Sequence, residues 1–176
     1  MITIRRAQVD DAVALARLAE HTFRETFTTA DNLTDMTLYC AKTFAMEIQR
    51  QEILSSNRVT LLVEVSGQLI AYAQIRLHAP KDCVVANHPS ELQRLYVEKA
   101  WHGRGVAHQI MAQVLSVAAS AGSDQLWLGA WEHNPRAIAF YRKYGFSIVG
   151  EHIFQFGHEL QRDLVMKTPI PKPLSG

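Results

Sequence analysis

Two glycines on either side of an arginine, Gly103-Arg104-Gly105, stand directly before apolar residues with helical spacing. Glycine adopts positive φ values without strain and lets a ligand come close to the backbone. The unpaired N–H groups at a helix start attract anions, as does the helix dipole. This stretch can therefore bind phosphate, and Arg104 would add a charge-assisted contact. A tight turn that only leads into a helix explains the same residues, so both interpretations stay open on this stretch alone.

Two common nucleotide-binding motifs do not fit this loop. A dinucleotide fingerprint needs a third glycine three residues after the second, and His108 occupies that position. A Walker P-loop needs Gly-Lys followed by Ser or Thr, which the sequence does not contain. If the loop binds phosphate, the phosphate belongs to another kind of ligand.

The second group of chemically useful residues lies in the stretch from Asn134 to Phe146, NPRAIAFYRKYGF. Asn134 is a good N-cap and the proline after it suits the first helical position, so a short helix is predicted. Tyr141 on this helix carries a phenol that can donate a proton. The alternatives are that Tyr141 only packs with Ile138 and Tyr144 on one helix face, and that Asn134 is only a cap.

Candidate general bases are the carboxylates near the ends of two predicted strands. Glu91 begins the strand before the glycine loop, and Glu132 ends the strand after it. His88 and His133 are weaker candidates, and each of the four can equally be an ordinary surface residue. A base is useful because an alkylammonium has a pKa of about 10.4, so little of it is nucleophilic at neutral pH.

The elements that must position these residues follow a mixed order of strands and helices. Helices are expected from Asp10 and Asp11 to about Phe27, over 33–55 in two pieces that divide near Phe44, from Val106 to Gly122, and over 134–145. Strands are expected at 2–7, 59–65, 69–77, 91–97, 125–131, 147–154 and 163–167. This order predicts an α/β fold with a mixed sheet and a parallel pair around the helix that follows the glycine loop.

The composition favours one globular domain. The chain has 176 residues, of which 48% are hydrophobic, and it carries 18 basic and 17 acidic residues for a net charge of +1. The sequence shows no concentrated basic face, so nothing in it suggests nucleic acid as a partner. The sequence contains no apolar run of about 18 residues, so no membrane partner is expected. The polar N-terminus does not resemble a signal peptide. We expect a domain over 1–168 and a Pro-rich C-terminal tail over 169–176, and we expect the segment TPIPKPLSG, 168–176, to be frayed.

Cysteine and histidine usage gives no metal motif. Cys40 and Cys83 have no metal-binding or redox spacing, and we expect them to be reduced thiols in a cytoplasmic protein. The eight histidines include no His-Glu-x-x-His pattern, so no metal is expected.

The glycine loop and the helix after Asn134 together resemble the GNAT acyltransferases. Their pyrophosphate loop reads Arg/Gln-x-x-Gly-x-Gly/Ala, and the window here runs from His102 to Ala107. Its two small positions match, while His102 replaces Arg or Gln. The second family signature is present as Asn134, Ala137, Phe140, Tyr141, Gly145 and Phe146. The resemblance covers nearly the whole chain.

The resemblance implies a role for each matching residue. The strand Leu95-Tyr96-Val97 would pair with pantetheine, the Val97 N–H would polarise the thioester carbonyl, and Tyr141 would protonate the leaving thiolate. Lys143 could reach the adenosine phosphates, although a solvated helix lysine explains it too. The implied cofactor-binding residues are Leu95, Tyr96, Val97, His102, Gly103, Arg104, Gly105, Val106, Ala107, Asn134, Ala137, Tyr141 and Lys143. The implied catalytic residues are Tyr141 and Val97, with Glu91 or Glu132 as the base.

The resemblance also implies the fold and the reaction. The fold is a single domain with a mixed, mostly antiparallel sheet of about seven strands. A central parallel pair is splayed around the acetyl-CoA site, and helices cover both faces. The expected activity is acetyl transfer from acetyl-CoA to a primary amine by direct attack in a ternary complex, without a metal. A non-catalytic coenzyme A-binding sensor is the alternative from another class.

A narrower resemblance concerns the acceptor. The chain looks like the bacterial PaiA-type branch, known as spermidine/spermine N-acetyltransferases. One matching feature is the segment TFRETF near the N-terminus. The others are seven C-terminal residues, Gly150, His152, Phe154, Gly157, Gln161, Asp163 and Met166. This branch implies a polyamine acceptor, for which Glu25, Asp31 and Asp35 are candidate contacts. A protein N-terminus, a lysine or an amino-acid-like metabolite are alternative acceptors. By resemblance, the edge strand of the C-terminal hairpin is compatible with a homodimer.

Overall fold

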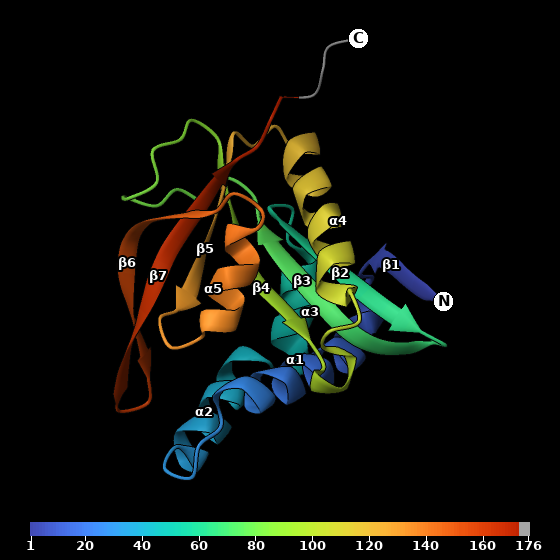
Figure 1. The fold of residues 1–176 in the computed structure, drawn as a ribbon. Helices are drawn as coiled ribbons and strands as arrows, with labels where there is room; N and C mark the ends of the chain where they lie inside the picture. The colour runs from blue at the N-terminus through green and yellow to red at the C-terminus, as the bar shows by residue number, and fades with distance from the viewer. Residues whose placement is uncertain (173–176) are drawn as a thin grey trace.

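Seven strands form one mixed sheet in the computed structural model, which describes residues 1–172 (Figure 1). The strands are β1 (Ile2–Arg6), β2 (Arg58–Val65), β3 (Gln68–Arg76), β4 (Pro89–Val97), β5 (Gln125–Trp131), β6 (Ser147–Phe156) and β7 (Glu159–Pro169). Their order across the sheet is β1-β2-β3-β4-β5-β7-β6, and only the β4–β5 pair is parallel. The expected seven-stranded, mostly antiparallel sheet with a central parallel pair is confirmed.

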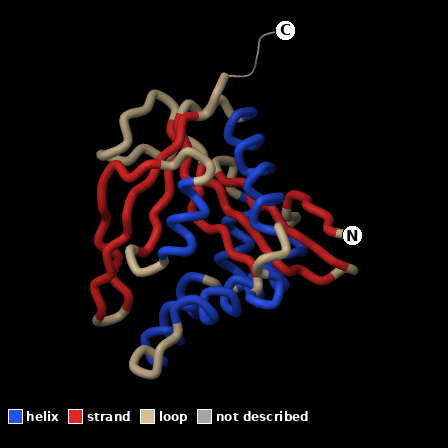
Figure 2. Tube along the Cα trace, in the orientation of Figure 1, coloured by secondary structure: helices blue, strands red, loops and turns tan. Residues whose placement is uncertain are grey.

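Helices cover both faces of the sheet, as expected (Figure 2). They are α1 (Ala12–Phe27), α2 (Leu33–Thr43), α3 (Met46–Leu54), α4 (Val106–Ser120) and α5 (Pro135–Arg142), with short 3-10 turns η1 (Val9–Asp11) and η2 (Lys99–Trp101). The predicted division of 33–55 into two helices near Phe44 is confirmed. Helices α1 and α2 pack on one face of the sheet, and α4 and α5 pack on the other.

The apolar periodicity of α4 explains why this helix lies against the sheet. Its residues at helical spacing, Val106, Ile110, Met111, Val114 and Ala118, are almost completely buried. They pack against apolar side chains of β2, β3, β4 and β5. Burial of an aliphatic side chain of this size contributes about 1.5–3 kcal/mol. This packing holds the N-terminus of α4, and the glycine loop before it, at one end of the sheet.

The parallel strands β4 and β5 separate soon after they begin to pair. They pair only at Pro89↔Gln125, Ser90↔Leu126 and Glu91↔Trp127. Next to this point the pairing of β4 with β3 contains a bulge at Gln93, which bends the strand. The rest of β4 therefore has no strand on its β5 side, and a wedge opens between the two strands.

The backbone groups that face this wedge follow from the β3–β4 pairing. The Glu98 N–H donates to the Ile70 carbonyl at 2.9 Å, and bonded and non-bonded pairs alternate along an antiparallel ladder. Tyr96 therefore exchanges its hydrogen bonds with β3. The N–H and C=O groups of Leu95 and Val97 point to the other side, into the wedge.

Two expectations about the C-terminus were wrong. Strands β6 and β7 are longer than predicted and are joined directly at Gly157 and His158. The chain is not frayed from Thr168, because β7 continues through Pro169 and Ile170 is buried, with its N–H donating to the Asp124 carbonyl at 2.9 Å. The expected domain limit at 168 thus falls inside β7, and the last part of the expected tail, 173–176, lies outside the described residues.

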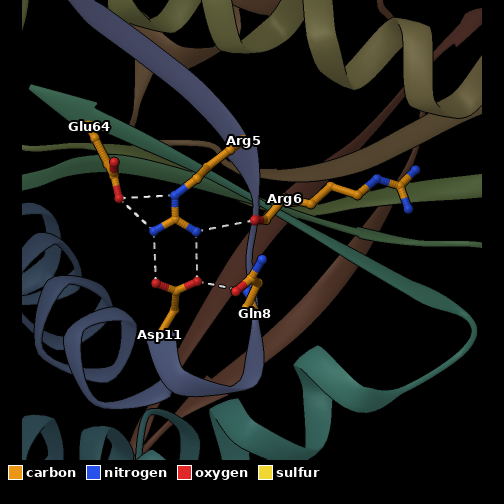
Figure 3. A network of polar contacts seen from close by, with 5 residues as sticks. All are labelled: Arg5, Arg6, Gln8, Asp11 and Glu64. Carbon is orange, nitrogen blue, oxygen red and sulfur yellow. Dashed lines mark hydrogen bonds and ion pairs between the residues drawn. The ribbon is translucent and has the colours of Figure 1, made fainter. Parts of the chain in front are cut away.

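An arginine joins β1 to β2 and to the start of α1 (Figure 3). The Arg5 guanidinium donates two hydrogen bonds to the Asp11 carboxylate at 2.7 and 2.8 Å, and its Nε donates to Glu64 at 3.1 Å. Asp11 also accepts the Gln8 N–H at 2.7 Å. The hydrogen bonds from Arg5 lower the pKa of the Asp11 carboxyl below its usual range. Asp11 was expected to cap the helix and occupies the N-cap position of α1, but its side chain makes no capping hydrogen bond there and instead anchors the edge strand β1.

Candidate active site

A cavity of about 650 Å³ lies beside the wedge, at the N-terminus of α4. Its walls come from the end of β4, the glycine loop and one side of α5. It brings together nearly all the residues predicted to bind the cofactor, namely Leu95, Tyr96, Val97, His102, Gly103, Gly105, Val106, Ala107, Asn134, Ala137, Tyr141 and Lys143. We call it the donor cavity. Arg104 is the predicted cofactor-binding residue that does not line it.

The glycine loop has the geometry of an anion-binding turn. Gly103 and Gly105 have φ values of 75° and 78°, a region that other residues adopt only with strain. A Cβ atom at either glycine would meet nothing within 4 Å, so a ligand can approach the backbone there. Gly105 is the N-cap of α4, and the Gln109 N–H makes the first bond of the helix, to the Gly105 carbonyl at 3.1 Å. The helical N–H groups before Gln109 have no acceptor within the helix.

Positive side chains surround this turn. Lys99, Arg136 and Lys143 line the donor cavity. The guanidinium of Arg104 instead lies 5.1 Å from the centroid of the Trp101 ring. The sequence reasoning missed Arg136, although its place directly after the helix-starting Pro135 could have identified it. The turn and these cations fit the phosphates of a coenzyme A molecule.

His102, which replaces the usual Arg or Gln of the family loop, connects three parts of the site. Its Nε2 lies 2.8 Å from the Val97 carbonyl oxygen, and its Nδ1 lies 2.9 Å from Nη1 of Arg136. Because a guanidinium can only donate, Nδ1 accepts and Nε2 carries the proton. His102 therefore holds the loop and α5 against the end of β4 through its side chain.

Tyr141 projects from α5 into the donor cavity. Its hydroxyl makes no hydrogen bond with any residue of the described range 1–172. Burial raises the pKa of the phenol, so it is fully protonated at neutral pH and available as a donor. Asn134 is the N-cap of α5, since its Oδ1 accepts the Ala137 N–H at 3.2 Å. The Asn134 side chain also lines the cavity, so cap and ligand contact are compatible.

A second cavity of about 380 Å³ lies on the α1 side of the wedge. Tyr96 lines both cavities, so the two lie on either side of this residue. Seven other aromatic side chains line the second cavity: Phe23, Phe27, Tyr39, Phe44, Trp127, Trp131 and Phe154. Its charged and titratable residues are Arg76, Lys81, Glu91, Arg94, His152 and Asp163. We call it the acceptor-side cavity.

The two candidate bases occupy different environments. Glu91 lines the acceptor-side cavity and accepts a hydrogen bond from Arg76 at 2.8 Å. Burial raises the pKa of the Glu91 carboxyl, while the positive charge of Arg76 opposes this shift. Glu132 accepts a hydrogen bond from Arg162 at 2.9 Å and lines neither cavity. The ring of His133 lies near Glu132, at 3.6 Å, and also lines neither cavity.

The three acids named for a polyamine are not gathered in one place. Glu25 lines the donor cavity and accepts the Lys99 N–H at 3.1 Å. Asp35 contacts the β6–β7 turn, where it accepts the His158 N–H at 3.4 Å. Asp31 is exposed, lies near the end of the segment that joins α1 to α2, and lines neither cavity.

Two general features of the described residues bear on other functions. Within residues 1–172, no three His, Cys, Asp or Glu side chains are grouped so that they could hold a metal ion. None of the helices in this range has the length and apolar character needed to cross a bilayer.

Comparison with known proteins places the chain in a family. Residues 14–146 match the Acetyltransferase (GNAT) family, which is more than half of the chain. The chain belongs to the GNAT acetyltransferases. The sequence is 25% identical to an uncharacterized N-acetyltransferase in the pepI 3' region of Lactobacillus delbrueckii subsp. lactis, over 97% of this chain and 96% of that protein.

The chain is also similar to a mycobacterial protein over part of its length and, in its fold, to a solved structure. An uncharacterized N-acetyltransferase of Mycobacterium tuberculosis is 35% identical, over 62% of this chain and 65% of its own length. The fold is similar to that of the PaiA N-acetyltransferase from Thermoplasma acidophilum, solved in complex with coenzyme A, with a TM-score of 0.77 and 18% identity over 96% of this chain and 99% of that chain. Membership of the GNAT family makes the chain an acyltransferase that uses acetyl-CoA as its donor.

Proposed function

We propose that this GNAT protein transfers the acetyl group of acetyl-CoA directly to a primary amine while both substrates are bound. The observation that carries the proposal is that Tyr96, beside the β4–β5 wedge, lines both cavities. Donor and acceptor can enter from opposite sides and react there. Neither cysteine of the chain lines either cavity, which supports direct attack over an acyl-cysteine intermediate.

The donor would bind along the open edge of β4. The outward N–H and C=O groups of Leu95 and the outward N–H of Val97 can pair with the amides of pantetheine as a further strand would. The phosphates would lie on the turn at Gly103 and Gly105, close to Arg136 and Lys143. In this arrangement the Val97 N–H is a candidate to stabilise the oxyanion.

Acetyl transfer then needs an orderly movement of protons. The neutral amine attacks the thioester carbon, the C–N bond forms and the C–S bond breaks. Tyr141 would donate its proton to the leaving thiolate, because its phenol is protonated and has no other partner within 1–172. The amine must lose a proton before attack, which requires a base or water near the acceptor.

Two classes of amine are candidates for the acceptor. The resemblance to the PaiA-type branch favours a polyamine such as spermidine or spermine. Against this, Glu25, Asp31 and Asp35 do not form a common binding surface. An amino-acid-like amine is the second candidate, because Arg76, Lys81 and Arg94 on the cavity wall could attract its carboxylate. The cytoplasmic location and the homodimer stay predictions from the sequence.

A thiol-release assay tests the proposed function. The protein is incubated with acetyl-CoA and, in turn, with spermidine, an arylalkylamine, an amino acid and peptides with a free N-terminus or a lysine. We expect free coenzyme A to be released only when a suitable amine is present. Release with none of these amines, from a protein that still binds acetyl-CoA, would favour the non-catalytic sensor.

A further inference from the structure

Asp163 of β7 is a carboxylate without a partner in the acceptor-side cavity. It is half-buried, and it makes no hydrogen bond or ion pair with any residue from 1 to 172. Its side chain lies over Gly129, where a Cβ atom would be 3.4 Å from Asp163 Oδ2. The other carboxylate that lines this cavity, Glu91, is paired with Arg76. A carboxylate that is partly buried and unpaired is costly, and a cationic ligand would offset that cost.

Asp163 also lies level with the end of β4. It is the direct neighbour of Trp131 in the β5–β7 ladder. Strands β4 and β5 are in parallel register at Glu91↔Trp127. When both strands are followed beyond this pair, Trp131 of β5 comes level with the end of β4. Tyr96, which lines both cavities, is at this end of β4. Asp163 is thus level with the end of β4, where we propose that the thioester lies.

The aromatic walls indicate what the ammonium is attached to. The rings of Phe27 and Trp131 have centroids 5.7 Å apart, and those of Tyr39 and Phe154 are also 5.7 Å apart. Phe23 stacks on Tyr39 at 4.8 Å. Such walls bind flat apolar groups and attract a cation over the ring faces.

The positive side chains of the cavity argue against an acceptor with several charges. Arg94 is neutralised by Glu52 at 2.7 Å and Arg76 by Glu91 at 2.8 Å. Lys81 has no carboxylate partner in the range 1–172; its Nζ lies 3.4 Å from Nδ1 of His152. One unpaired carboxylate can meet one ammonium group. A second or third ammonium would find no unpaired carboxylate among the described residues of this cavity and would face the charge of Lys81, which is unfavourable.

We infer that Asp163 binds the reacting ammonium group of the acceptor and takes its proton, and that the acceptor carries one ammonium on an aromatic or other apolar body. This inference rests on the proposed function. The ammonium gives one proton to Asp163, and the neutral nitrogen attacks the thioester carbon. The second proton lost by nitrogen returns to Tyr141, which has protonated the thiolate, and Asp163 releases its proton to solvent.

The electrostatic surroundings of Asp163 are consistent with this role. Burial raises the pKa of its carboxyl, with an opposing effect from His152. A raised pKa brings a carboxyl closer to the neutral range in which a base must exchange protons. The other titratable or charged groups that line this cavity are Tyr39 of α2, Arg76 of β3, Lys81 of the 77–88 loop, Glu91, Arg94 and Tyr96 of β4, and His152 of β6.

The test compares Asp163→Asn with the matched control Glu159→Gln, an exposed carboxylate in the same strand. The probe amines are 2-phenylethylamine and spermidine. We expect the wild-type protein to have a higher kcat/KM for 2-phenylethylamine. Asp163→Asn should lower that kcat/KM by roughly 100-fold at neutral pH, the usual scale of a general base. The KM for acetyl-CoA should stay unchanged, and Glu159→Gln should behave as wild type.

The pH dependence separates this role from a structural one. The loss of kcat/KM caused by Asp163→Asn should become smaller as the pH rises toward the pKa of the amine, because more of the amine is then neutral in solution. Asp163→Ser removes the same charge with a smaller side chain, and thermal melting identifies the folded variants. Wild-type kcat/KM in a folded variant, or a preference of the wild type for spermidine, would overturn the inference. Thiol release by no amine at all would instead contradict the proposed function.

Discussion

At the scale of single residues, the Tyr141 phenol carries the most specific chemical assignment. Its side chain lines the donor cavity, and burial raises the pKa of its phenol. Replacement by phenylalanine removes the proton donor and leaves the ring in place. We expect Tyr141→Phe to lower kcat more than roughly tenfold, within the range of general acid catalysis, with an unchanged melting temperature.

A matched control for this variant is Tyr144→Phe. Tyr144 lies just beyond α5, and its hydroxyl is hydrogen-bonded to Nδ1 of His108 at 2.7 Å. Tyr144 does not line the donor cavity. Steady-state thiol release with saturating acetyl-CoA measures kcat for both variants. Equal rates for Tyr141→Phe and the wild type would remove Tyr141 from the mechanism.

The Arg5–Asp11 pair makes a separate prediction about stability. The pKa of Asp11 is lowered in the folded state, so its ionised form stabilises the fold above the unfolded pKa. This contribution is lost as the pH falls through the lowered folded pKa. Asp11→Asn should therefore reduce the free energy of unfolding by about 1 kcal/mol at neutral pH, and the two proteins should converge in acid. Urea unfolding of both proteins at neutral and at acidic pH measures the free energies of unfolding. An equal difference between the two proteins at both pH values would show that the carboxylate charge is not responsible.

At the scale of elements, the start of α4 depends on the left-handed conformation of Gly105. A larger residue would place its side chain where we propose that the pyrophosphate approaches. We expect Gly105→Leu to raise the KM for acetyl-CoA by roughly tenfold or more, which corresponds to about 1.4 kcal/mol.

Gly122 provides the control for backbone strain in this experiment. It follows the other end of α4, it also has a φ of 78°, and a Cβ there would also meet nothing within 4 Å. Gly122→Leu should therefore lose similar stability and keep a normal KM for acetyl-CoA. An unchanged KM in Gly105→Leu would mean that the loop is only a turn.

The elements themselves were largely predictable from local patterns. The apolar period of α4 and the β-branched run of β2 specify helix and strand within a few residues. Strands β6 and β7 were predicted too short. β6 is an edge strand whose residues are mostly exposed and show no regular alternation of apolar and polar types, and the first residues of β7 are also mostly exposed. The bulge at Gln93 has no glycine or proline to mark it, so the wedge could be expected only from the family resemblance.

The two halves of the site differ in how well the sequence predicts them. The donor cavity is built mainly from two continuous segments, the glycine loop and α5, so local motifs identify it. The acceptor-side cavity combines side chains such as Phe27, Trp131 and Asp163, which are far apart in the chain. Their proximity depends on the order of β5, β7 and β6 in the sheet, which no short motif encodes.

At the scale of the whole molecule, the two cavities open on opposite sides of one wedge and share Tyr96. In the direct-attack mechanism that we propose, both substrates are bound before the acetyl group moves. Initial rates measured at several concentrations of both substrates should therefore give intersecting double-reciprocal lines. Parallel lines, the pattern of an acetylated enzyme intermediate, would contradict direct attack.

The most direct test of the central claim follows the acetyl group itself. The protein is incubated with acetyl-CoA labelled with ¹³C in the acetyl group and with the amine that gives the fastest thiol release, and the products are identified by mass spectrometry. We predict one labelled acetyl group on the amine nitrogen for each coenzyme A released. Release of coenzyme A with the label recovered as free acetate, or no transfer to any amine, would contradict the account.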